Sequence, residues 1–194
     1  MSDVDDILRL LDREIWLVTA AHDGQRGGLI ATFVNQASIA PETPRMLVGI
    51  ARQHHTWRLI EASRAFTLHL LDESQLDWVW RFGLQSSHAS PLLQGEGPAV
   101  RVFDKFADMP TLNAIAWLTC RVETSMDTGD RTIYLAEVLA GKLEKPLPPL
   151  TLKRLLQLAP PERLRELRDG MARDAAIDAA AIRTWREGSP RGEG

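Results

Sequence analysis

The most unusual stretch of this sequence is Gly27-Gly-Leu-Ile-Ala-Thr-Phe-Val-Asn-Gln-Ala-Ser-Ile39, which begins as an apolar strand and then gathers polar side chains. Asn and Gln are unfavourable in a dry sheet interior unless their amide groups find partners. Such a strand end can offer backbone N–H groups, hydroxyls and amides to an anionic or heteroaromatic ligand. The alternative is a solvated strand end that leads into a proline-rich loop, and the pattern alone favours this alternative. The polar residues are Thr32, Asn35, Gln36 and Ser38.

Further strand patterns lie on both sides of this stretch, and most connections between them are short enough for antiparallel pairing. The last two strands are joined by Asp127-Thr-Gly-Asp130, which is typical of a β-hairpin. A sheet closed into a barrel leaves no exposed strand edge, so a mainly β (α+β) fold with an antiparallel split β-barrel is expected. The predicted strands are 15–20, 28–35, 45–51, 65–71, 114–125 and 132–143.

Helices are expected in the connections and at the C-terminal end of the chain. Short ones are predicted in the first dozen residues, at 56–63 with Thr56 as its cap, and at 74–82. The Ser-, Gly- and Pro-rich stretch 85–110 is interpreted as a loop or lid. A helical pattern follows Pro161. We therefore divide the chain into a barrel domain at 1–146, a helical extension at 147–186 and a disordered tail at 187–194.

The composition excludes several classes of protein. The chain has 23 Lys and Arg against 26 Asp and Glu, a net charge of −3, which gives no footprint for nucleic acid. Its apolar runs are too short to span a bilayer, and its acidic N-terminus is unlike a signal peptide. Cys120, the single cysteine, is expected to fill the core. No Rossmann glycine motif, phosphate loop, nucleophile elbow or zinc motif is present. We expect a cytoplasmic protein with no nucleic-acid or membrane partner.

A second stretch with chemical potential is Arg52-Gln-His-His-Thr-Trp57, directly after the strand at 45–51. A cation, two imidazoles and a hydroxyl meet here at a predicted helix N-terminus, where free N–H groups favour an anion such as phosphate. An ordinary capped helix with a basic entry explains the pattern equally well. A metal shared by His54 and His55 is not expected, because neighbouring side chains point in different directions.

The third stretch is the hairpin Thr128-Gly-Asp-Arg-Thr-Ile-Tyr134. A tight turn requires Gly and Asp for conformational reasons alone, which is a sufficient explanation of these residues. Arg131 is nevertheless placed where it can lie beside a negatively charged cofactor.

Together, these stretches resemble the flavin reductase-like, FMN-binding split-barrel family over residues 14–143. The resemblance implies a homodimer that holds FMN near the subunit interface, with NAD(P)H as a substrate. The motifs that carry it are Val18-Thr19, the Gly-x-x-Ala-Thr segment before Ser38 and Pro41, the basic residue before Thr56, Phe66-Thr-Leu-His-Leu-Leu71, Arg81-Phe-Gly83, Trp117-Leu-Thr-Cys-Arg-Val122 and Gly129-Asp-Arg-Thr-Ile-Tyr-Leu-Ala-Glu-Val138.

The resemblance also assigns cofactor-binding residues by position. Arg52 stands where the family often has a phosphate-binding lysine, and Arg131 stands where a histidine on the nicotinamide side is frequent. Asn35-Gln36 replaces a small, Ser-rich run of dedicated flavin reductases. The full set for FMN is Thr32, Phe33, Val34, Asn35, Gln36, Ser38, Arg52, His54, His55, Thr56 and Arg131.

Three functions follow from this interpretation. The first is an FMN reductase that transfers hydride from NAD(P)H to flavin, in which the protein supplies orientation rather than a catalytic acid, base or nucleophile. The second is an electron-transfer flavoprotein with bound FMN and a protein redox partner. The third is a dimeric interaction protein without a ligand.

Overall fold

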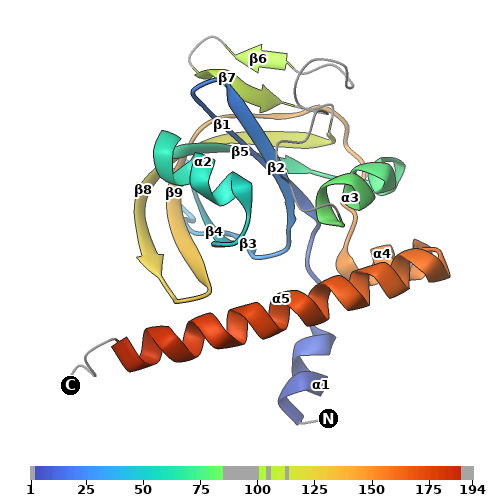
Figure 1. Cartoon of the computed structure of the whole chain (residues 1–194). Coiled ribbons are helices and arrows are strands. Elements are labelled where there is room, and N and C mark those ends of the chain that lie inside the picture. Colours follow the sequence, from blue (N-terminus) through green and yellow to red (C-terminus); the bar gives the residue numbers. More distant parts are fainter. Residues whose placement is uncertain (1–2, 85–100, 104–105, 112–113, 189–194) are drawn as a thin grey trace.

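Seven antiparallel strands form one curled sheet at the centre of the computed structural model (Figure 1). The structure describes residues 3–84, 101–103, 106–111 and 114–188, with the backbone alone for 101–111. The strand order across the sheet is β2-β1-β5-β8-β9-β4-β3. The strands are β1 (Trp16–His22), β2 (Gln25–Ala31), β3 (Val34–Gln36), β4 (Arg45–Ala51), β5 (Ala65–Leu70), β8 (Ala116–Asp127) and β9 (Arg131–Leu143).

The sheet is curled because its two edge strands, β2 and β3, follow one another in the chain. Only Thr32 and Phe33 separate them, so the two edges must come close together. The backbone N–H of Gly49 in β4 donates to the carbonyl of Phe33 at 2.8 Å, which fixes this junction to the far side of the sheet. We call this junction the split. It confirms the expected split barrel and corrects the single strand predicted at 28–35, since the chain changes its pairing partner from β1 to β4 within that range.

Helices cover the barrel and continue beyond it. Helix α2 has His54 rather than Thr56 as its N-cap, so the predicted cap was wrong by two residues. Helix α5 includes Glu187 and Gly188, which corrects the predicted start of the tail, and the remaining residues lie outside the described part. The helices are α1 (Asp3–Leu10), α2 (His55–Ser63), the 3₁₀ turn η1 (Glu73–Gln75), α3 (Leu76–Gly83), α4 (Leu152–Leu158) and α5 (Pro161–Gly188).

Part of the segment interpreted as a loop at 85–110 forms strands. β6 (Arg101–Phe103) pairs with β7 (Phe106–Thr111) in a separate two-stranded sheet. The prediction was wrong there because the Ser, Gly and Pro residues that suggested a loop precede the strands, except Pro110, which lies within β7. Residues 85–100 lie outside the described part, so a lid in that range stays a prediction.

Two groups of buried side chains hold the fold together. One fills the barrel interior and includes Val18, Phe66 and Cys120. The other joins β1 to α3 and α4 through residues such as Ile15 and Leu155. Each fully buried aliphatic or aromatic side chain contributes about 1.5–3 kcal/mol. The thiol of Cys120 is buried as expected, and burial raises its pKa to about 12.

Helix α5 crosses the end of the barrel where the β8–β9 hairpin and the start of α2 lie (Figure 1). None of its 28 residues is buried, so few contacts hold it against the barrel. No helix in the described ranges is long and apolar enough to cross a membrane.

Candidate functional site at the split of the barrel

Phe33 marks the split with an aromatic ring that is 46% exposed. Gly49 lies beside it, and a Cβ at that position would stand 3.3 Å from the Cβ of Phe33 and 3.1 Å from Ile133. A side chain at this position would require Ile133 or Phe33 to shift by a few tenths of an ångström. The guanidinium carbon of Arg131 lies 4.7 Å from the centre of the Phe33 ring, and that of Arg13 lies 5.3 Å from it. Both distances suit cation–π contact, and we call these three residues the arginine–phenylalanine stack.

Arg131 is held by two carboxylates from different parts of the chain. Its side chain pairs with Asp130 at 2.5 Å and with Asp178 of α5 at 2.7 Å. Burial alone raises the pKa of Asp130, but the hydrogen bond and charge of Arg131 outweigh it and hold that pKa below its usual value. The pKa of Asp178 is raised instead, because burial and the nearby carboxylates Asp130 and Asp174 outweigh the attraction of Arg131. Asp130 is thus the stronger partner of Arg131.

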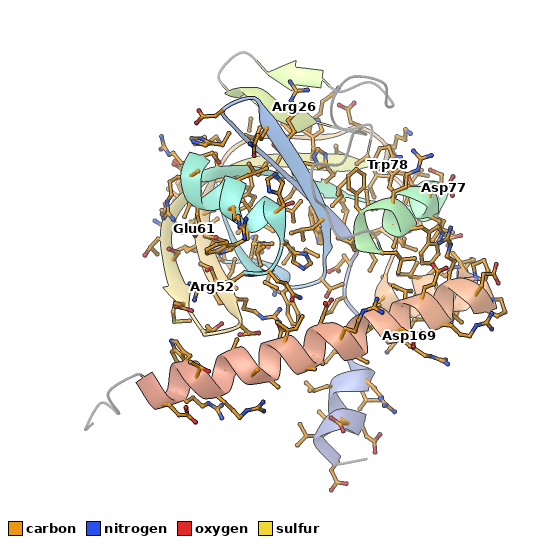
Figure 2. All side chains as sticks on the ribbon, in the orientation of Figure 1. Arg26, Arg52, Glu61, Asp77, Trp78 and Asp169 are labelled. Atoms are coloured by element: carbon orange, nitrogen blue, oxygen red, sulfur yellow. The ribbon has the colours of Figure 1, made fainter. Side chains whose placement is uncertain are left out.

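The turn before α2 brings further positive charge to the same end of the barrel. The Arg52 guanidinium lies 5.4 Å from the Trp57 ring and donates to Asp127 at 2.9 Å. Its backbone N–H donates to the carbonyl of Asp130 at 3.1 Å, which joins the turn to the hairpin. Figure 2 shows Arg52 at the end of the barrel that faces α5. His54 makes no side-chain cap, so the first turn of this nine-residue helix is free of one. The turn therefore combines a cation with an uncapped helix N-terminus.

His54 extends this region toward α5. Burial lowers the pKa of its imidazole and Arg131 lowers it further, whereas Asp174 and Asp178 raise it, and burial prevails. A hollow of about 550 Å³ lies next to it, between the turn, the end of α3 and one face of α5. Its lining combines apolar side chains such as Phe82 and Leu167 with charged residues of α5: Glu166, Asp169, Arg173 and Asp174. The apolar part suits a ring system, whereas the carboxylates do not suit a phosphate, so the hollow fits the uncharged part of such a ligand.

Thr56 and His55 lie deeper in the fold than the sequence suggested. Thr56 is fully buried, and its hydroxyl has no hydrogen-bond partner within the described residues. It faces Gly27 of β2, where an added Cβ would approach the hydroxyl to 2.9 Å and the ring of His55 to 3.4 Å. A phosphate contact by Thr56 stays a prediction that requires the turn to open.

The residues of β3 form a second group, farther along the strand. Val34 is buried in the barrel core, and Thr32 is half-buried at the split. Asn35 and Gln36 are exposed, but the Gln36 amide donates to the carbonyl of Ser38 at 2.6 Å and the Ser38 hydroxyl accepts from Ala40. Gln36 and Ser38 therefore order their own loop, and Asn35 keeps its amide available.

The structure thus brings Phe33, Arg52, His54 and Arg131 to one end of the barrel. It adds two residues that sequence reasoning missed, Arg13 before β1 and Asp178 in the middle of α5. No local motif distinguishes either residue, because each acts only through its distance from Phe33 or Arg131. In the described part of the chain, no group of His, Cys, Asp or Glu is arranged to hold a metal ion.

Comparison with known proteins agrees with this architecture. The model of the flavin reductase-like domain matches residues 8–155, which include the whole barrel. The chain belongs to this family. Among curated relatives, the reductase component of a 4-nitrophenol 4-monooxygenase/4-nitrocatechol 2-monooxygenase from Rhodococcus opacus is 31% identical over 137 residues, covering 66% of this chain. The alignment spans 64% of that protein, and only 24% of the putative diflavin flavoprotein A 3 from Nostoc.

Solved structures of flavin proteins have the same fold. The styrene monooxygenase flavin reductase from Pseudomonas putida S12 superposes with a TM-score of 0.62 at 25% identity, over 77% of this chain and 91% of that one. A flavoredoxin from Methanosarcina acetivorans gives 0.64 at 19% identity, over 73% and 80%. These likenesses show the fold that the chain shares with flavin proteins.

Proposed function

We propose that this protein binds FMN at the split of its barrel and reduces flavin with NAD(P)H. The observation that carries the proposal is the meeting of an exposed aromatic ring, two arginines and an uncapped helix N-terminus at one place, in a chain of the flavin reductase-like family. An isoalloxazine ring needs aromatic or apolar contact, and a ribityl phosphate needs cations and N–H donors. The residues present fit both requirements.

The turn at 52–56 is the place for the phosphate. Arg52 approaches it from the hairpin side, and the first N–H groups of α2 point out of the helix without a side-chain cap. The Thr56 hydroxyl, which has no hydrogen-bond partner among the described residues, belongs to the first turn of α2, so a small opening of the turn gives the phosphate a further donor. Each charge-assisted hydrogen bond contributes about 1.5–3 kcal/mol.

The remaining site residues orient the ring system. Phe33 and the hollow beside His54 supply apolar surface, and Asn35 supplies an amide that can bind the polar edge of a flavin. FMN, when bound, supplies the acceptor for a hydride from the reduced nicotinamide. The chain itself holds and orients the two rings, so no acid, base or nucleophile is required of it.

A second copy of the chain is the partner we expect. The outer face of β4, β8 and β9 carries cross-strand neighbours that are apolar and only partly covered: Leu47, Met126, Ile133 and Leu135. An exposed apolar surface of this kind next to a ligand site is typical of an interface. Sedimentation velocity should show a dimer, and Leu47→Asp should shift it toward monomer.

The test of the function has two parts. Titration of the protein with FMN and with riboflavin, followed by flavin fluorescence, should show FMN binding at least about tenfold more tightly, because riboflavin lacks the phosphate. Steady-state assays with NADH and with NADPH should then show flavin-dependent oxidation of the nicotinamide. Equal affinity for the two flavins would contradict the phosphate assignment. FMN binding without turnover by either nucleotide would leave the electron-transfer flavoprotein, with a protein redox partner, as the function.

A further inference from the structure

The two arginines of the arginine–phenylalanine stack differ in their partners. Arg131 pairs with two carboxylates, but Arg13 makes no ion pair within the described part of the chain. Arg13 is half-buried and lies against the same ring as Arg131. Asp130 and Asp178 both pair with Arg131 and offset its charge, so among the described residues the Arg13 guanidinium has no carboxylate of its own. Arg13 is therefore a cation placed for an anionic ligand.

The contact between Arg131 and Asp178 is one that a ligand can replace. Asp178 comes from α5, which has no buried residue, and its carboxylate is 19% exposed. Asp130, the neighbour of Arg131 in the hairpin, is 9% exposed and stays with Arg131 whatever α5 does. Release of Asp178 costs Arg131 one partner and leaves it paired. The same release frees one side of the Arg131 guanidinium, which already lies on the same ring as Arg13.

We propose that Arg13 and Arg131, held on the ring of Phe33, form a second anion site that takes the diphosphate of a nucleotide in exchange for the Asp178 carboxylate. This inference rests on the proposed function, which supplies the ligand class. FMN carries a single phosphate, assigned above to the turn at 52–56. The hydride donor NAD(P)H and the flavin FAD share an adenosine diphosphate half, and two guanidinium forks suit its two phosphates.

The experiment uses ADP as the probe, because it is the part common to both sources. Isothermal titration calorimetry of the full chain with ADP should show binding that Arg13→Ala weakens at least about tenfold. Asp178→Asn removes the competing charge and should strengthen binding about threefold or more. Arg13→Lys keeps the positive charge but loses the planar guanidinium that can donate two parallel hydrogen bonds. Its affinity for ADP should lie between those of wild type and Arg13→Ala. Matched controls on exposed positions of α5 outside the hollow, Arg165→Ala and Glu162→Gln, should stay within about twofold of wild type.

The opposite signs of the two variants separate this site from a general charge effect. Wild-type affinity in Arg13→Ala, or weaker binding in Asp178→Asn, would overturn the inference. Thermal unfolding of each variant shows whether it is folded, and Arg13→Lys keeps the test valid if Arg13→Ala is not.

Separate titrations identify the source of the diphosphate and separate the two proposals. If the site binds FAD, Arg13→Ala should weaken the binding of FAD more than that of FMN. If the site binds the hydride donor, Arg13→Ala should weaken the binding of NADH. A loss of equal size for FMN would mean that Arg13 holds the flavin phosphate and would overturn the inference. Absence of FMN binding with Arg13-dependent ADP binding would refute the proposed function and leave this site standing.

Discussion

Gly129 offers the sharpest test of how α5 is held on the barrel. It lies in the β8–β9 hairpin with a φ of +93°, and a Cβ there would stand 2.7 Å from the Cβ of Trp185 and 3.2 Å from the carbonyl of Ala181. Gly129→Ala therefore has two costs. The left-handed backbone costs a non-glycine residue about 1–2 kcal/mol. The new methyl group also meets atoms fixed to the helix backbone, so the C-terminal part of α5 must move away.

Gly24 provides the matched control. It has a similar φ of +73°, and an added Cβ there would meet nothing within 4 Å. Gly24→Ala therefore carries the backbone cost alone. In urea titrations Gly24→Ala should lose about 1–2 kcal/mol of unfolding free energy, and Gly129→Ala should lose this amount together with the contact energy of α5. Only Gly129→Ala should also weaken the docking of α5.

The docking is measured by limited proteolysis with trypsin, read by mass spectrometry at the bonds after Arg183 and Arg186. Loss of about 1–2 kcal/mol of contact energy raises the population of the undocked helix, and hence its cleavage rate, roughly 5–30-fold in Gly129→Ala. Gly24→Ala should be cleaved at the wild-type rate. If the two variants are cleaved equally fast, Trp185 does not hold α5 on the hairpin and the reasoning fails.

Three further predictions concern single side chains. Arg52→Ala should weaken FMN binding by roughly tenfold or more in a fluorescence titration, because a charge-assisted contact contributes about 1.5–3 kcal/mol, whereas exposed Arg58→Ala should not change it. His54, whose pKa is lowered by burial, favours its neutral form in the fold; its stabilising effect is present above about pH 6.5 and is lost as the pH falls. His54→Gln should therefore lose less unfolding free energy than wild type between about pH 7.5 and pH 5.5, and equal losses would contradict this. Burial and the 2.6 Å hydrogen bond to Glu61 raise the pKa of Tyr134, so the stability that its phenol contributes is complete below about pH 10 and is lost above it. Tyr134→Phe should cost about 1 kcal/mol of unfolding free energy near neutral pH in urea and should flatten the fall in stability at alkaline pH. An unchanged fall would refute the assignment.

The elements that the sequence predicts well are those whose cause is local. The strand at 45–51 has the predicted bounds, and the turn at 127–130 joins β8 to β9 as its Gly and Asp indicated. Periodicity and turn chemistry act over a few residues, so both are visible in the sequence. The strand predicted at 28–35 fails for the opposite reason. Nothing within it shows that the pairing partner changes after Ala31, because the partners β1 and β4 are set by closure of the whole sheet.

In the candidate site, too, the residues predicted well are those that belong to a local sequence motif. Arg52 and His54 were recognised because the turn after β4 is a continuous motif, and Arg131 because it follows a hairpin signature. Thr56 was taken for a cap because its residue type suits one. The register of α2 on β2 places it against Gly27 instead. Residue type indicated the kind of chemistry, and packing decided which side chains reach the surface.

The charge at the split is set by segments that the barrel motif does not contain. Arg13 precedes the first strand, and Asp178 lies beyond the matched family domain at 8–155. Arg13 adds a positive charge at the Phe33 ring, and Asp178 offsets part of the positive charge of Arg131. The net charge of these groups decides how strongly the split attracts a phosphate. Two chains with identical barrels and different flanking segments can therefore differ in nucleotide affinity. In this chain α5 lines the hollow beside His54 and, through Asp178, pairs with Arg131. Loosening α5 should therefore raise the affinity of Arg131 for anions, even though it removes one wall of the hollow.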